Sequence, residues 1–264
     1  MSVLVSKRTL SRHEYVNTFL ELYKFTEEKL SKIAKRKYRW IAEPIANQMN
    51  EIYNLIMQAN NDYFCYGIKL LDKPEQSKLI IGKLIDLQKP LFALWNIEDY
   101  ETRKMVNWVN YINKEIMYLL RLGCISHDER LKVFILDHKA MNEAEFIRTM
   151  SKLHKIIYSK TISLKESLRS TKGVLLMNLA DEAFYRVCHA ILYFPTNRKM
   201  YENRKEDISI AIDCLKQMQQ PLAALFNIMN YSENTMNEIA KLLDKEMTLL
   251  EAVYKSDIKR FKNL

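Results

Sequence analysis

The strongest constraint on this chain is an internal repeat with a constant spacing of 131 residues. Residues 88–100 read QKPLFALWNIEDY and residues 219–231 read QQPLAALFNIMNY, with eight of thirteen positions identical. Identical residues recur at the same spacing outside this stretch, at Glu51 and Glu182, at Ala59 and Ala190, and at the pairs Lys114–Glu115 and Lys245–Glu246. Such a repeat predicts one folding unit of about 130 residues, present twice.

The fold class follows from the scarcity of turn residues and from the spacing of apolar ones. The 264 residues include only four Gly and five Pro, whereas 48% are apolar, which favours a few long helices with real cores. Apolar positions recur at helical spacing at Met105, Trp108, Val109, Ile112, Ile116, Leu119 and Leu120, and again at Met236, Ile239, Ala240, Leu243, Met247 and Leu250. We therefore predict an all-α protein of two tandem antiparallel four-helix bundles, residues 1–125 and 132–264, connected near residues 123–139.

Capping and proline signals predict where the helices begin and end. Capping boxes at Ser11–Glu14 and Asn142–Glu145 begin the first helix of each half, which in the first half should extend to about Lys35. Pro44 should lie in the first turn of the second helix, whose equivalent begins at Ser170 or Thr171. Residues 60–62 with Gly67, and in the second half residues 194–197, should end these helices. Pro90 and Pro221 should kink or break the third helices.

The residues that carry common catalytic and metal chemistry do not occur at the required spacing. A ferritin-type metal site needs Glu three residues before His, but those positions hold Leu10, Cys124, Ile135, Ser151 and Arg186. The four glycines form no phosphate-binding loop, and Cys65, Cys124, Cys188 and Cys214 form no C-x-x-C pair, so reduced and mostly buried thiols are expected. We expect no catalytic residue, no metal and no cofactor. The repeated glutamates, Glu115 and Glu246 among them, are expected on solvated faces or in ion pairs.

One enzymatic alternative remains open from the sequence. HEPN-type ribonucleases are also helical bundles and use an Arg and a His separated by four to six residues. Arg121 with His127 and Arg148 with His154 fit that spacing, although neither pair recurs in the other half.

The expected compartment is the cytoplasm. No run of 18 apolar residues occurs, so no membrane-spanning segment is predicted. Residues 1–8 contain too short an apolar stretch for a secretory signal.

The charge balance points to an anionic partner. The formal net charge is +9, and concentrated positive charge neutralises nucleic-acid phosphates regardless of sequence. Three clusters are predicted to contact RNA or DNA phosphates: Lys29, Lys32, Lys35, Arg36, Lys37 and Arg39; Arg198, Lys199, Arg204 and Lys205; and Lys255, Lys259, Arg260 and Lys262. The first cluster could instead stabilise the negative end of the first helix.

Several short stretches resemble one family of four-helix-bundle proteins from bacterial mobile elements. They are residues 37–40 (KYRW), 59–61 (ANN), 194–197 (FPTN) and 255–262 (KSDIKRFK). The family includes the accessory variability determinant proteins of diversity-generating retroelements and the proteins encoded by 23S rRNA intervening sequences. The resemblance implies a basic bundle that forms homo-oligomers, binds nucleic acid and, in the first group, docks on a reverse transcriptase. Family members carry one bundle, so their subunit number does not transfer to a chain with two.

The sequence therefore predicts a non-enzymatic, nucleic-acid-binding accessory protein, possible partners being RNA, DNA and a reverse transcriptase. The alternatives are a scaffold that binds only proteins and, third, the ribonuclease.

Overall fold

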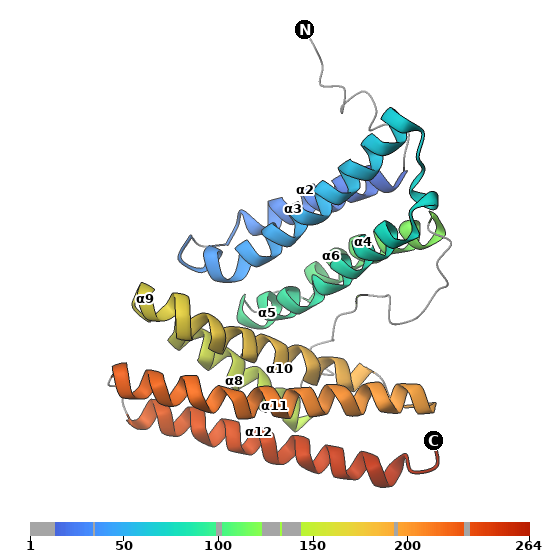
Figure 1. Cartoon of the computed structure of the whole chain (residues 1–264). Helices are drawn as coiled ribbons and strands as arrows, with labels where there is room; N and C mark the ends of the chain where they lie inside the picture. Colours follow the sequence, from blue (N-terminus) through green and yellow to red (C-terminus); the bar gives the residue numbers. More distant parts are fainter. Residues whose placement is uncertain are drawn as a thin grey trace. The chain divides into compact units, whose positions relative to one another are not determined.

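The part of the chain that can be described is helical. The computed structural model describes residues 14–33, 35–98, 102–122, 133, 144–192, 195–229 and 233–264, and most of these residues lie in helices and none in a strand (Figure 1). The protein is all-α. It divides into two compact units, the first formed by Met1–Leu94 and Tyr100–Ile135 and the second by Trp95–Asp99 and Leu136–Leu264.

The first unit contains α2 (Glu14–Leu30), α3 (Lys35–Tyr66), the short 3-10 helix η1 (Leu70–Asp72), α4 (Pro74–Asp86), most of α5 (Gln88–Glu98) and α6 (Thr102–Leu122). Helix α2 packs against α3 and α6, and α4 packs against the same two helices. The apolar spacing of α6 explains this packing, because Trp108, Ile112, Ile116 and Leu119 are all buried on one face.

The second unit contains α8 (Glu145–Ile162), α9 (Glu166–Leu168), the π-helical turn η3 (Arg169–Gly173), α10 (Val174–Leu192), α11 (Arg198–Met229) and α12 (Glu233–Arg260). Helix α8 packs against α10 and α12, and α11 packs against the same two helices. In each unit, therefore, the first and third of these four helices each pack against the second and the fourth.

Three helix starts follow the 131-residue spacing. Helical segments begin at Glu14, Lys35 and Thr102 in the first unit and at Glu145, Glu166 and Glu233 in the second. A side-chain hydrogen bond between equivalent positions also occurs in both units. Tyr23 donates from its hydroxyl to Asn50 Oδ1 at 2.6 Å, and the residues 131 positions later, His154 and Asp181, are joined by a 2.7 Å hydrogen bond between His154 Nε2 and Asp181 Oδ1.

Two expected helix starts were wrong. Pro44 lies inside α3, as its tenth residue, and not in a first turn. The helix continues through it because Ile41, Ala42 and Ile45 are all buried, and packing on both sides outweighs the one backbone hydrogen bond that proline removes. Thr171 lies within η3 and not at a cap, and its hydroxyl donates to the Ser167 carbonyl.

The two third helices differ at their prolines. Pro90 lies in the first turn of α5, and a single turn residue, Leu87, separates α5 from α4. Pro221 lies inside the uninterrupted α11. The expected break therefore occurs in the first unit alone, even though Pro90 and Pro221 are equivalent in sequence.

The other predicted boundaries are partly confirmed. Helix α2 ends at Leu30, earlier than expected. Helix α3 continues through residues 60–62 and ends at Tyr66, followed by Gly67 with a φ of 67°, a conformation that glycine adopts at no steric cost. Helix α10 ends before Pro195. Ser11 and Asn142 lie outside the described residues, as does most of the connector at 123–139.

None of the described helices is both long enough and apolar enough to cross a membrane.

Candidate nucleic-acid interface

Two of the three predicted basic clusters meet at one end of the second unit. The start of α11 and the end of α12 lie side by side there, next to the C-terminus (Figure 1). We call this region the basic end and define it by the side chains of Arg198, Lys199, Lys205, Lys255, Lys259, Arg260 and Lys262.

An internal ion pair holds the two helix ends together. Arg204 Nε lies 2.6 Å from Asp257 Oδ2, and the two side chains are only 13% and 8% exposed. Arg204 Nη1 also donates to the carbonyl oxygen of Ala190, at the end of α10. The guanidinium is thus occupied by the fold, so Arg204, which the sequence placed among the phosphate-binding residues, has a structural role.

Aromatic rings complete the junction. The ring centroids of Tyr201 and Phe261 are 5.9 Å apart, and both side chains are buried. Lys205 Nζ lies 6.0 Å from the Tyr254 ring centroid, and Arg198 Cζ lies 5.5 Å from that of Tyr201. The charged groups of Lys205 and Arg198 thus lie within cation–π distance of aromatic rings.

The basic end has a net positive charge. Residues 198–206 and 251–264 contain eight basic and four acidic side chains, a net charge of +4. Arg198 pairs with Glu202 at 2.5 Å and Lys255 with Glu251 at 3.8 Å. Exposed pairs of this kind contribute about 0.3–0.5 kcal/mol, so a phosphate can displace them.

Three exposed positive side chains near the C-terminus carry no such pair within the described residues. Lys259, Arg260 and Lys262 are exposed, and no acidic side chain of the described chain lies within salt-bridge distance of them. Their charge is fully available to a ligand. They are the strongest phosphate-binding candidates in the second unit.

The predicted cluster from Lys29 to Arg39 belongs to the first unit. Lys29 Nζ lies 4.7 Å from the Phe25 ring centroid, and Lys32 pairs with Glu28 at 3.1 Å. The hydrogen bond and charge of Lys32 lower the pKa of Glu28. Lys35, Arg36, Lys37 and Arg39 lie on the first turns of α3, but their side chains are outside the described set.

Two glutamates expected at the surface are buried. Glu115 and Glu246, equivalent at the 131-residue spacing, are both 0% exposed. Burial raises the pKa of Glu115 to about 8, against the opposing effects of a hydrogen bond from Thr18 and the charge of Lys114. Burial also raises the pKa of Glu246 to about 9, and neither of its carboxyl oxygens has a hydrogen-bond partner. Both are therefore neutral acids at pH 7.

The sequence did carry a signal for this burial. Glu115 follows Ile112 by three residues and precedes Leu119 by four, so it lies on the apolar face of α6. The expectation of a solvated face was wrong because it followed from the charge of the residue and not from its position on the helix.

The ribonuclease pairs do not form a site within the described residues. His154 is 0% exposed, its Nε2 is bonded to Asp181, and its ring stacks on Phe184 with centroids 4.9 Å apart. Arg148, its proposed partner, is exposed. A buried, bonded imidazole cannot reach a scissile phosphate. His127 lies outside the described residues.

The cysteines of the described chain agree in part with expectation. Cys188 and Cys214 are buried and form no disulfide, whereas Cys65 is exposed. Burial, with a smaller contribution from Glu246, raises the pKa of Cys188 well above its usual value. Cys188 is thus an inert packing residue, and its neighbour His189 bonds through Nδ1 to Asp207 at 2.5 Å.

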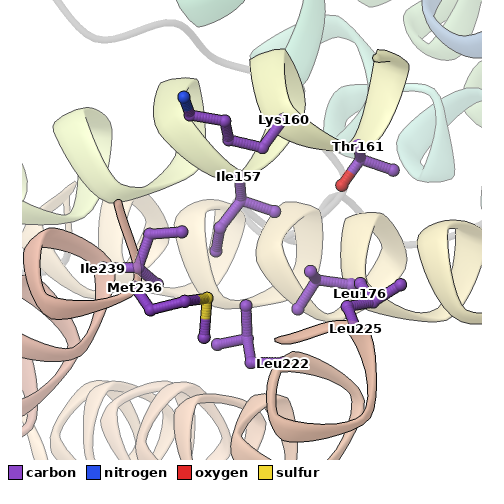
Figure 2. A pocket seen from close by; sticks show the side chains of 8 residues that line it. All are labelled: Ile157, Lys160, Thr161, Leu176, Leu222, Leu225, Met236 and Ile239. Atoms are coloured by element: carbon purple, nitrogen blue, oxygen red, sulfur yellow. The ribbon is translucent and has the colours of Figure 1, made fainter. Parts of the chain in front are cut away.

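A small pocket lies among the four long helices of the second unit. It is lined by Ile157, Lys160, Thr161, Leu176, Leu222, Leu225, Met236 and Ile239 (Figure 2). The amine end of Lys160 points away from the apolar side chains. The cavity volume is about 10 Å³, room for a single water at most, so this is a packing defect of the core and not a ligand site.

Comparisons with protein-family models, with characterised proteins and with solved structures found no match.

Proposed function

We propose that this chain is a non-enzymatic nucleic-acid-binding accessory protein, and that the basic end contacts the phosphate backbone. The observation that carries the proposal is the meeting of two basic clusters, far apart in sequence, at the paired ends of α11 and α12. Phosphate contacts by lysine and arginine supply most sequence-independent affinity for nucleic acid. The arrangement favours backbone contact over the reading of base sequence.

We further propose that the two units are copies of one four-helix bundle. Three helical segments of each unit begin 131 residues apart, and the long helices of each unit contact one another in the same order. The equivalent contacts Tyr23–Asn50 and His154–Asp181 support the same conclusion. Duplication within one polypeptide gives two nucleic-acid contacts a high effective concentration for each other.

The partner protein is proposed from the sequence resemblance alone. The accessory variability determinant proteins of that family dock on a reverse transcriptase, and a chain with surplus positive charge can bridge such an enzyme to its template. Co-purification with a reverse transcriptase that survives nuclease treatment would support this partner. Homo-oligomers are proposed on the same basis.

The test of nucleic-acid binding is direct. Fluorescence anisotropy with labelled single-stranded RNA, single-stranded DNA and duplex DNA should show binding at low salt that weakens steeply as salt is added. The same RNA, recovered after incubation with the protein, should be intact. Absence of binding to all three at low salt would contradict the proposal.

A further inference from the structure

A second surface, in the first unit, has the chemistry of a site for bases. An open hollow of about 390 Å³ lies between α2 and α6, lined by Phe25, Asn107, Asn110, Tyr111 and Lys114. This volume is within the range of about 300–1,000 Å³ for small-ligand sites. Neither the repeat nor the charge clusters pointed to it.

The aromatic rings that line the hollow, Phe25 and Tyr111, are held in position by each other and by the buried Trp108. Phe25 and Tyr111 have ring centroids 5.0 Å apart, and Phe25 meets the edge of Trp108 at 6.0 Å. Trp108 is buried and donates from its indole nitrogen to Thr26 Oγ1 at 2.9 Å. The two rings that line the hollow are thus pre-positioned, while Phe25 and Tyr111 themselves are only half-buried.

The two asparagine amides that line the hollow have no hydrogen-bond partner within the described residues. Asn107 and Asn110 are exposed, and neither side-chain amide makes a hydrogen bond within the described chain. Each amide offers both donors and an acceptor. A planar ligand with donors and acceptors on its edge would satisfy both.

Positive charge flanks the hollow. Lys29 Nζ lies against the Phe25 ring, 4.7 Å from its centroid, and the charge of Lys29 also contributes to lowering the pKa of Glu28. Lys114 lines the hollow and makes only a long, exposed pair with Glu21, 3.7 Å between Lys114 Nζ and Glu21 Oε2. A ligand with anionic groups beside its planar part would meet both lysines.

We propose that this hollow binds an unpaired base of single-stranded RNA or DNA, with the adjoining phosphates near Lys29 and Lys114. Stacking on aromatic rings within a positively charged surface is how proteins bind single strands without reading sequence. A base in a duplex is stacked between its neighbours and cannot enter. The inference rests on the proposed nucleic-acid binding and adds to it a preference for single strands.

The test compares single-stranded and duplex forms of one labelled oligonucleotide. We expect Tyr111→Leu and Phe25→Leu each to weaken single-strand binding at least about fivefold, the lower limit for a lost base–aromatic stack, and to leave duplex binding unchanged. Asn110→Asp, an exposed change that leaves the core intact, should weaken single-strand binding through repulsion. Tyr66→Leu is the matched control, because Tyr66 is an exposed aromatic of the same unit outside the hollow, and it should have no effect.

A crosslinking experiment identifies the contact in the unaltered protein. Irradiation with an oligonucleotide that carries 4-thiouridine should attach the base to Phe25 or Tyr111, as located by mass spectrometry. Crosslinks only elsewhere, or single-strand affinity unchanged in all three hollow variants, would overturn the base site and leave backbone binding by the basic end standing. Failure of the unaltered chain to bind either form would overturn both proposals.

Discussion

Arg204 and Asp257, 53 residues apart in sequence, form the ion pair that joins the start of α11 to the end of α12. Both side chains are largely buried, and Arg204 has a second bond to the Ala190 carbonyl. The pair thus fixes three helix ends at one place. The arrangement of the exposed lysines and arginines around it depends on this junction.

Removing one partner of this pair should destabilise the second unit strongly. Arg204→Met leaves the Asp257 carboxylate buried without its partner, which typically costs about 3–5 kcal/mol. Urea unfolding followed by circular dichroism measures the change. Arg198→Met is the control, because Arg198 is exposed and pairs only with Glu202, and it should cost less than about 0.5 kcal/mol. Equal losses in the two variants would show that the Arg204 pair is not structural.

A double variant distinguishes the effect of losing the ion pair from the effect of leaving one buried charge without a partner. Arg204→Met with Asp257→Leu removes both charges, so no unpaired buried charge remains. We expect the double variant to be more stable than Arg204→Met alone. A double variant less stable than the single one would mean that packing around the two side chains, and not their charge, dominates.

The buried Glu246 should make stability fall as pH rises. In the unfolded chain its carboxyl loses a proton near pH 4.5, whereas the folded protein keeps that proton to about pH 9. The folded state therefore binds more protons across this interval, and the free energy of unfolding decreases from pH 4.5 to 9. Glu246→Gln removes the ionisable carboxyl and with it this loss of stability. The variant should therefore be more stable than the unaltered protein by about 2–4 kcal/mol at pH 7.

Thermal unfolding measured as a function of pH tests whether stability falls as the pH rises. Glu246→Gln and the unaltered protein should have similar stability at pH 4 and diverge above it. Glu206→Gln, a change at an exposed glutamate of the same unit, should leave the profile unchanged. A Glu246→Gln protein less stable than the unaltered one at pH 7 would show that the carboxylate is charged and paired.

The second unit should fold without the first. Residues 132–264 include all the helices from α8 to α12, and these helices form the bulk of one compact unit. Expressed alone, this segment should unfold in a single cooperative transition, as small domains usually do. A segment that has no cooperative transition would contradict the proposal of two self-sufficient bundles.

Helix content and the core face of α6 could be predicted from the spacing of apolar residues, whereas Ala240 of the equivalent stripe in α12 is exposed. The stripe from Met105 to Leu120 is buried as expected. Proline positions were predicted less well, since Pro44 and Pro221 lie inside helices whose neighbours are buried on both sides. At these prolines, the packing of neighbouring side chains outweighs the helix-breaking preference of proline. Such packing cannot be predicted from the local sequence.

The residues of the candidate site could be predicted from their charge, but which of them lie together in the fold could not. The clusters at Arg198 and at Lys255 were identified from charge, but only the fold shows that they meet. Arg204 carries the same charge as Lys205 and yet is turned inward to Asp257, a difference that depends on a partner 53 residues away. The hollow at Phe25 and Tyr111 likewise joins residues from two helices, and no sequence spacing marks it.

The most direct test of the account is the salt dependence of nucleic-acid binding in two triple variants of equal charge. Lys259→Gln, Arg260→Gln and Lys262→Gln together remove the unpaired charges of the basic end. Lys172→Gln, Lys216→Gln and Lys241→Gln remove three exposed charges of the same unit elsewhere. The first variant should reduce the slope of log affinity against log salt concentration by about two to three, and the second by less than about one. Equal slopes in the two variants would contradict a phosphate-binding role for the basic end.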